Sequence, residues 1–155
     1  MSFDDAAIAT IIDKVVSYAL ASNRFELVNG HEPKSAPGNG LTCAVWVQDI
    51  RPIRTSGLAA TSGFIRLQAR IYTSFVGEPA DLIDPNVAAA ASDLIGALTL
   101  DFDLGGDADV RAVDLLGMSG ETLSAQAGYI EIDRKMYRVM TINVPIIIND
   151  MWAQV

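Results

Sequence analysis

Acidic side chains in one short segment come closest to a metal site. A glycine and four carboxylates fall at positions one, three, six, seven and nine of a calcium-binding loop: Asp101, Asp103, Gly106, Asp107 and Asp109. The pattern then fails, because Gly105 occupies the fifth position and Ala112 stands where the loop requires a bidentate glutamate. We interpret the segment as a solvated acidic turn and expect no metal there. A small metal-binding module built on this loop remains the alternative from a different functional class.

The chain offers few side chains for nucleophilic catalysis. His31 is the only histidine and lies in a loop rich in proline and glycine, which is a poor platform for a Ser-His-Asp or Cys-His arrangement. Cys43 is the only cysteine, and its alternating apolar neighbours favour a buried strand position over a reactive thiol. Gly38 and Gly40 lack the third glycine and the following helix of a dinucleotide site. The sequence therefore predicts no enzyme, no zinc and no cofactor.

Basic side chains are concentrated in one stretch. Between residues 51 and 77 there are four arginines and no acid: Arg51, Arg54, Arg66 and Arg70. The stretch from 78 to 121 holds ten acids against one arginine. A basic segment on an otherwise acidic subunit favours a head-to-tail contact, in which one patch of each copy meets a different patch of the next. We expect these arginines at a subunit interface, and we expect the acidic segment to face either solvent or the lumen of a ring.

Aromatic residues on expected strands have two interpretations. Trp46, Tyr72 and Tyr129 each lie in an alternating segment, where an aromatic side chain most often packs in the core. Aromatic residues also dominate protein interfaces. Trp46 is therefore a further interface candidate, with a core position as the commoner alternative.

Overall composition limits the partners. The formal net charge is -8, and tight binding to DNA is not expected because nucleic-acid affinity depends on basic side chains. No apolar run approaches the roughly 18 residues of a membrane span, and the acidic start of the chain does not resemble a signal peptide. A chain of 155 residues that is 50% hydrophobic and 19% charged suits one domain that forms an oligomer, made in the cytoplasm.

Hydrophobic periodicity predicts an α+β fold, an antiparallel or mixed sheet with two helices packed on one face. The first helix, opened by a capping pair of Ser2 and Asp5, ends near Ser22, and the second runs from an Asp84 N-cap followed by Pro85 to about 98. The expected strands are 41–48, 64–73, 110–115, 124–132 and 136–144, with the first two antiparallel. Residues 29–40 form a long loop, 51–63 form a projecting hairpin arm, and Pro145 lies at a strand end or an edge.

Several stretches of the chain resemble a known family. They are His31–Leu41, Val45–Gln48, Ser56–Ala59, Arg70–Tyr72, Ile83–Pro85, Asp114–Gly117, Leu123–Tyr129, Tyr137–Thr141 and Asn149–Asp150. In their residues and in their order along the chain, these stretches resemble those of the tail terminator proteins of long-tailed bacteriophages, especially siphovirus-like phages that infect actinobacteria. The likeness spans nearly the full length, and none of its motifs is chemical.

The resemblance implies a virion structural protein without enzyme activity. Its members form a homohexameric ring on the finished tail tube, contact the major tail tube protein on one side and bind head-completion proteins of the neck on the other. DNA passes through the lumen without tight binding, and no membrane is involved. The alternative within the virion is a head-completion or adaptor ring protein.

Overall fold

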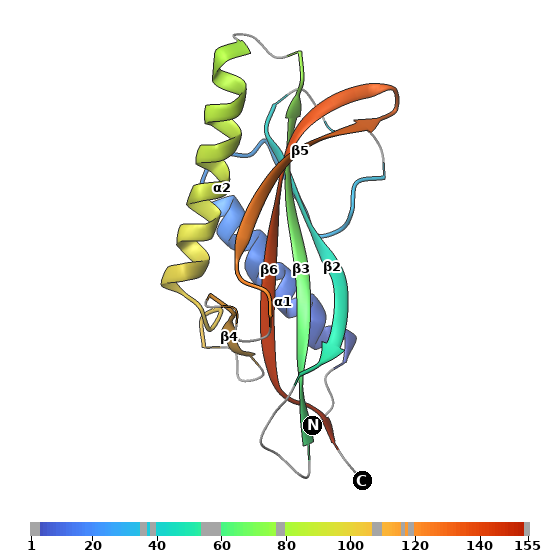
Figure 1. Ribbon diagram of the computed structural model, residues 1–155, viewed down its shortest axis with the longest axis vertical. Coiled ribbons are helices and arrows are strands. Elements are labelled where there is room, and N and C mark those ends of the chain that lie inside the picture. The colour runs from blue at the N-terminus through green and yellow to red at the C-terminus, as the bar shows by residue number, and fades with distance from the viewer. Residues whose placement is uncertain are drawn as a thin grey trace.

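A mixed β-sheet and two helices make up the part of the chain that the computed structural model describes, residues 4–34, 37, 40–53, 60–76, 80–106, 110–115, 117 and 120–153. The elements are α1 (Asp5–Ala21), β1 (Leu27–Asn29), β2 (Thr42–Pro52), β3 (Ala60–Ser74), a short 3-10 helix (Ala80–Leu82), α2 (Ile83–Leu100), β4 (Val110–Val113), β5 (Ser124–Ile132) and β6 (Lys135–Ala153). The strand order is β1-β2-β3-β6-β4, and β5 pairs with β6 as well (Figure 1). β1 is parallel to β2, while the other pairs are antiparallel. The predicted α+β fold with a mixed sheet is confirmed.

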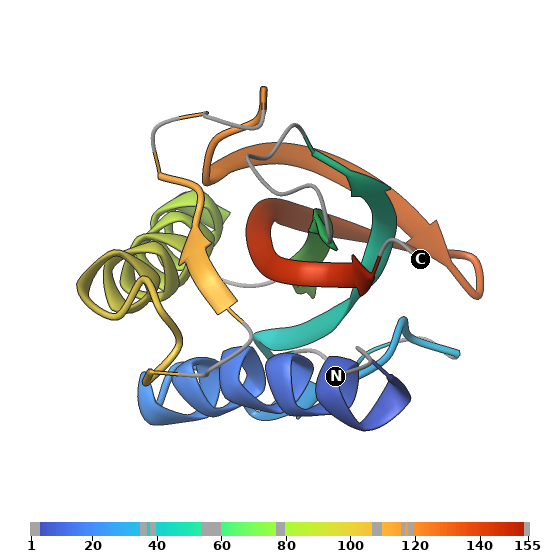
Figure 2. The same cartoon turned by 90° about the horizontal axis from the view of Figure 1, so that it is seen from below.

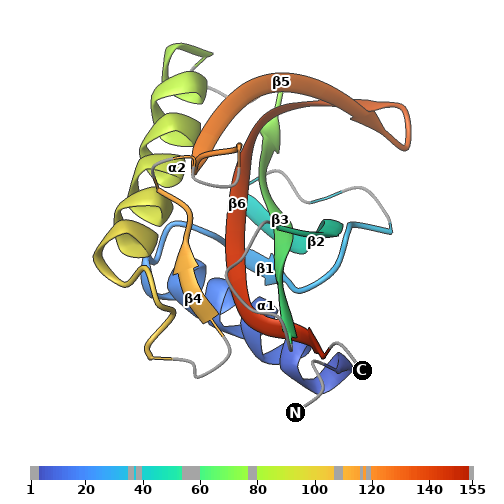
Figure 3. The same cartoon turned by 60° about the horizontal axis from the view of Figure 1, so that its bottom comes forward.

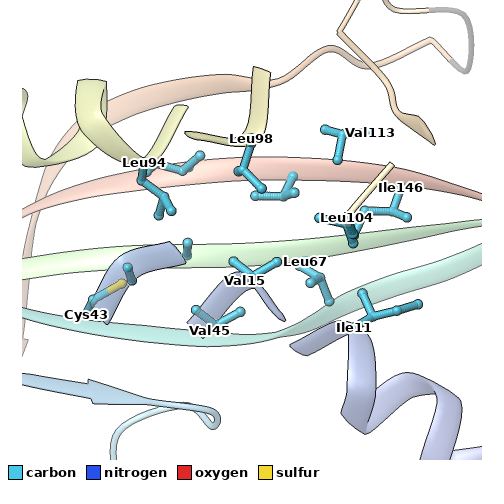
Figure 4. Packing of buried hydrophobic residues seen from close by; sticks show 14 of the residues in the cluster. Ile11, Val15, Cys43, Val45, Leu67, Leu94, Leu98, Leu104, Val113 and Ile146 are labelled. Atoms are coloured by element: carbon cyan, nitrogen blue, oxygen red, sulfur yellow. The ribbon is translucent and has the colours of Figure 1, made fainter. Parts of the chain in front are cut away.

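Both helices cover one face of the sheet (Figure 2). Alternate residues of the three long strands β2, β3 and β6 point toward the helices and are aliphatic or sulfur-containing: Cys43, Val45, Ile65, Leu67, Ala69, Ile71, Ile142, Val144, Ile146 and Ile148. Leu94 and Leu98 of α2 and Val15 of α1 pack onto this layer (Figure 4). Each fully buried aliphatic side chain contributes about 1.5–3 kcal/mol, so this layer is the main source of stability. We call this side the helix face.

The two helices begin differently from what the sequence predicted. Asp4 is the N-cap of α1, and its side chain accepts a hydrogen bond from the Ala7 N–H at 3.1 Å; Ser2 lies outside the described residues. α2 begins one residue before Asp84, with Leu82 as an N-cap that makes no side-chain hydrogen bond. The predicted Asp84 N-cap is therefore wrong. Asp84 lies inside α2, and its carboxylate accepts a hydrogen bond from Arg138 Nε on β6. Neither described helix is long and apolar enough to cross a membrane.

Pro145 lies inside a continuous strand, which corrects the expected position at a strand end or an edge. β6 spans 19 residues and pairs with β3 along nearly its whole length. On its other side it pairs with β5 through residues 135–143 and with β4 through residues 146–148. The Pro145 carbonyl accepts from the Asp114 N–H at 2.8 Å, so its backbone groups point away from β3. The missing N–H of the proline therefore falls at the gap between β5 and β4, where it costs no bond of the β3 ladder.

All five predicted strands occur, but most have different bounds: β2 ends at Pro52 rather than 48, β3 begins at Ala60 rather than 64, β4 ends at Val113 rather than 115 and β6 ends at Ala153 rather than 144. β5 has the predicted bounds, and β2 and β3 pair antiparallel as expected, with Val45 opposite Ala69. β1 was not predicted. β2 reaches Pro52 and β3 begins at Ala60, so the ends of the expected arm are strand, whereas residues 54–59, Arg54 included, lie outside the described residues. The projecting arm stays a prediction.

Candidate interaction surface on the open face of the sheet

The face of the sheet opposite the helices, which we call the open face, holds most of the interface candidates. Side chains alternate along β3, so Arg66, Gln68 and Arg70 point away from the helix face to which Leu67 and Ala69 contribute. The β5 and β6 strands curve at one end of this sheet (Figure 3). Ion pairs, amide contacts and aromatic contacts follow one another along β3 on this face.

Arg66 is held by two carboxylates of its own chain. Its Nη2 lies 2.6 Å from Asp49 Oδ2 and its Nη1 lies 3.0 Å from Glu121 Oε1. The Arg66 side chain is 23% exposed, and its Nε and Asp49 Oδ1 are buried with no hydrogen-bond partner in the described part of the chain. Two ion pairs at this burial orient the guanidinium firmly, and the orphaned atoms leave unused hydrogen-bonding capacity beside them.

A β-bulge brings Asp49 to this cluster. The register of β2 against β3 shifts between Val47 and Asp49, so that Asp49 lies opposite Arg66 and Arg51 lies opposite Phe64. Without the extra residue, side-chain alternation would turn both Asp49 and Arg51 toward the helix face. The Arg51 Cζ lies 4.2 Å from the centroid of the Phe64 ring, a cation-π contact.

Arg70 is joined to two neighbouring strands. Its Cζ lies 5.4 Å from the centroid of the Trp46 ring on β2, and its Nε donates to Thr141 Oγ1 on β6 at 2.9 Å. Gln68, the next residue of β3 on the same face, donates from Nε2 to Asn143 Oδ1 at 3.4 Å. Polar side chains of β3, β5 and β6 line a cavity of about 320 Å³ here: Gln68, Arg70, Gln126, Thr141 and Asn143. No carboxylate contributes to the lining, so the cavity suits neutral or anionic groups of a partner.

Tyrosines close the other end of the open face. The rings of Tyr72 and Tyr137 meet edge to face with centroids 6.5 Å apart, and both side chains are buried. Burial raises the pKa of Tyr72 above its usual value. The Tyr137 hydroxyl donates to the Pro37 carbonyl at 2.8 Å and so anchors the loop before β2. Tyr129 corrects the core interpretation for aromatic residues, because its side chain is 59% exposed and lies edge to face with Phe75.

Asp101 and Asp103, two residues of the expected acidic turn, lie at the end of α2. The Tyr18 hydroxyl on α1 donates to Asp101 Oδ2, and the Gly105 N–H donates to Asp101 Oδ1 at 3.1 Å. These bonds, with the one from Tyr18 first, lower the pKa of Asp101 below its usual value. Burial, and then the bond to Asp101, raise the pKa of Tyr18 to about 12. Asp107 and Asp109 lie outside the described residues, and no group of three potential metal ligands occurs in the part that is described.

His31 and Cys43 do not form a catalytic pair. His31 is exposed, with Nδ1 3.0 Å from the Glu32 carbonyl oxygen. Cys43 is buried as predicted, and burial raises the pKa of its thiol to about 12, so the thiolate is scarce at neutral pH. Both residues border a cavity of about 170 Å³ beneath the loop, together with Lys34 and Tyr72.

Of the predicted interface residues, the structure brings Arg51, Arg66, Arg70 and Trp46 onto one face. It adds partners that the sequence did not reveal, namely Asp49, Glu121, Thr141 and Asn143. No known family model matches the chain, and no curated protein sequence matches it.

Proposed function

We propose that this protein is a virion structural protein of a long-tailed bacteriophage, a tail terminator that caps the tail tube. It ends polymerisation of the tube and offers the surface on which the head is joined. Its partners are further copies of itself in a hexameric ring, the major tail tube protein and the head-completion proteins of the neck. It is assembled in the host cytoplasm, resides at the head-proximal end of the tail and carries out no enzymatic reaction.

The observation that carries the proposal is that the stretches with the family resemblance contact one another in the fold. Arg70, Trp46 and Thr141 come from three such stretches and form one cluster on the open face. Such contacts are expected if the resembling residues share one structural role. Short stretches that resembled the family by chance would instead be scattered over the molecule.

Three further stretches join through β6. The Tyr137 hydroxyl bonds the Pro37 carbonyl in the loop before β2. Arg138 Nε lies 2.9 Å from Asp84 Oδ1 at the start of α2, and Arg138 Cζ lies 4.5 Å from the centroid of the Tyr129 ring. The resembling residues of six stretches are therefore linked by direct contacts, across a sequence separation of about a hundred residues.

The intrachain partners change how the arginines would serve a ring. Arg66 and Arg70 already meet partners within the chain, so they present oriented hydrogen-bond donors on a fixed surface rather than mobile positive charge. Fixed donors lose little side-chain entropy on binding, which favours a specific neighbour over nonspecific attraction.

The test is deletion of the gene from the phage that encodes the chain. A tube is an open stack of rings with no intrinsic end, so loss of the cap leaves heads and tubes unjoined and some tubes longer than normal. Electron microscopy of lysates measures both outcomes, and purified protein added to the lysate restores joining. An antibody against the protein labels the head-proximal end of wild-type tails.

Two results would decide against the proposal. Tails of normal length that stay firmly attached to heads in the deletion strain rule out a terminator. Heads that leak DNA beside free tails of normal length indicate a head-completion protein instead.

A further inference from the structure

β5 is the outer strand on one side of the sheet. It pairs with β6 along all nine of its residues, and no other described strand pairs with it. Figure 3 shows β5 on the outside of the curve that the two strands form, with β6 on its inner side. The register with β6 contains no shift, so the strand is regular from end to end.

The direction of the β5 backbone groups follows from two hydrogen bonds on β6. The Met136 carbonyl accepts from the Phe75 N–H next to β3, whereas the Pro145 carbonyl accepts from the Asp114 N–H on the opposite side. Even-numbered residues of β6 therefore bond toward β3 and odd-numbered ones toward β5. The odd residues of β6 lie opposite even residues of β5, as Val139 does opposite Gly128. The N–H and C=O groups of the odd residues of β5 consequently point outward: Ala125, Ala127, Tyr129 and Glu131.

This edge lacks the features that usually prevent strands from pairing between molecules. β5 contains no proline, no lysine and no bulge, and its one charged residue, Glu131, is next to last. The opposite side of the sheet is protected. β1 is only three residues long, and beyond it the β2 edge carries a register shift and ends at Pro52.

We propose that two copies of this protein pair through their β5 edges, antiparallel and about a two-fold axis at Gly128. In this register all nine residues of each strand overlap. Ala125 exchanges two backbone hydrogen bonds with Glu131 of the other copy, and Ala127 does the same with Tyr129. Four such pairs satisfy every outward-pointing backbone group of both strands.

Charge and side-chain size favour a second copy as the occupant of this edge. The two-fold register sets Glu131 opposite Ala125, whereas a parallel pairing in register would set two glutamates side by side. The pair on the axis is not hydrogen-bonded, which brings its backbones closest, to roughly 4.5 Å between Cα atoms, and glycine suits that approach. Tyr129, 59% exposed, would cover Ala127 of the other copy.

This contact goes beyond the proposed function. A two-fold contact joins two copies and then stops, whereas a ring needs a head-to-tail contact between different surfaces. Pairing through β5 is therefore a property of the free protein, and it does not depend on whether the chain caps a tail tube.

The first experiment removes one outward donor. Ala127→Pro deletes an N–H that points away from β6, so the fold is retained while the outer edge is blocked. Sedimentation of the wild-type protein should show a monomer–dimer equilibrium, and Ala127→Pro should weaken dimerisation about tenfold or more. Ala127→Thr, which keeps the N–H and suits a strand, is the matched control and should dimerise like the wild type. Circular dichroism verifies that both variants are folded.

The second experiment reports the register. Gly128→Cys places a thiol on the axis, where a Cβ meets only Val139 Cγ2 at 3.7 Å, and it should form a disulfide-linked dimer on mild oxidation. Gln126→Cys is the control and should not crosslink to itself, because its two copies lie four residues out of register, about 13 Å apart. The native Cys43 is buried and does not interfere.

A protein that stays monomeric at all accessible concentrations overturns the proposal. An oligomer that Ala127→Pro leaves unchanged does so too, as does crosslinking through Gln126→Cys in preference to Gly128→Cys. In the last case the β5 edge pairs with a different strand or in a different register.

Discussion

The two faces of this sheet are built from alternate residues of the same strands, but different kinds of interaction hold their side chains in place. On the helix face, Leu67 and Ile146 are fully buried beneath α1 and α2 among other aliphatic side chains. On the open face, Arg66 and Arg70 make directional contacts with side chains of neighbouring strands. Aliphatic packing is non-directional and scales with buried area, whereas each polar contact offsets the cost of removing its own groups from water. The helix face therefore determines how stable the fold is, and the open face determines which surface that fold presents.

The largest effect is expected on the helix face. Leu67→Ala should lower the free energy of unfolding by about 2–5 kcal/mol, because a cavity remains beneath the helices. Gln68→Ala, one residue along on the open face, is the matched control and should cost less than about 1 kcal/mol. Urea denaturation measures both. Equal losses for the two variants would break the distinction between the faces.

A smaller loss is expected at the Arg66 ion pairs. Arg66→Met keeps most of the side-chain volume but leaves Asp49 and Glu121 without their shared cation, and we expect a loss of about 1–3 kcal/mol. Adding Asp49→Asn to this variant should recover part of the loss, since one of the two uncompensated carboxylates is then removed. If Arg66→Met unfolds at the same urea concentration as the wild type, the cluster contributes nothing to stability and its role lies elsewhere.

The contact between Arg70 and Trp46 should contribute less again. A double-mutant cycle with Arg70→Met and Trp46→Leu is expected to give a coupling energy of about 0.5–1 kcal/mol, typical of a partly exposed cation-π pair. Thermal unfolding of the four proteins supplies the measurement. Independent effects of the two substitutions would mean that the ring and the guanidinium do not interact in solution.

The smallest effect is a pH dependence at Tyr18 and Asp101. Because the folded pKa of Tyr18 is raised from 10.0 to about 12, the unfolded chain loses this proton first, and stability should fall as pH rises from 10 to 12. The lowered pKa of Asp101 acts in the opposite direction, since its contribution is present above pH 3.8 and is lost as pH falls through the folded value. Tyr18→Phe should flatten both ends of the stability profile and lower stability at neutral pH, where the hydrogen bond to Asp101 is fully formed. An unaltered profile would contradict the hydrogen bond.

The sequence predicted what depends on local periodicity. Alternation identified the central parts of β2 and β3, the short turn near Asp133 helped to identify β5, and apolar spacing identified both helices within about two residues. Cys43 was placed correctly because its neighbours alternate around it. Composition also separated a basic segment from an acidic one along the chain, but the fold brings the two together where Arg66 pairs with Glu121.

The sequence could not predict what depends on partners distant in the chain. The bulge after Val47 has no local signal, so the meeting of Asp49 with Arg66 was unforeseen. Aspartate is a common helix N-cap, but the carboxylate of Asp84 instead pairs with Arg138, which is 54 residues away in the sequence. Pro145 was expected at a strand end because sequence alone does not reveal a gap between two other strands beside it.

The position of β6 in the chain has a consequence for how the protein folds. β6 follows every other described element in the sequence, yet it pairs with β3, β4 and β5, and Arg66 pairs with Pro145 across 79 residues. During synthesis the β2–β3 hairpin and both helices emerge before the strand that completes their aliphatic layer. Sheets dominated by such distant pairings fold slowly, and until they are complete their exposed hydrophobic surface can aggregate. We expect newly made chains to depend on chaperones until β6 leaves the ribosome, and yield on overexpression to rise when translation is slowed by cooling.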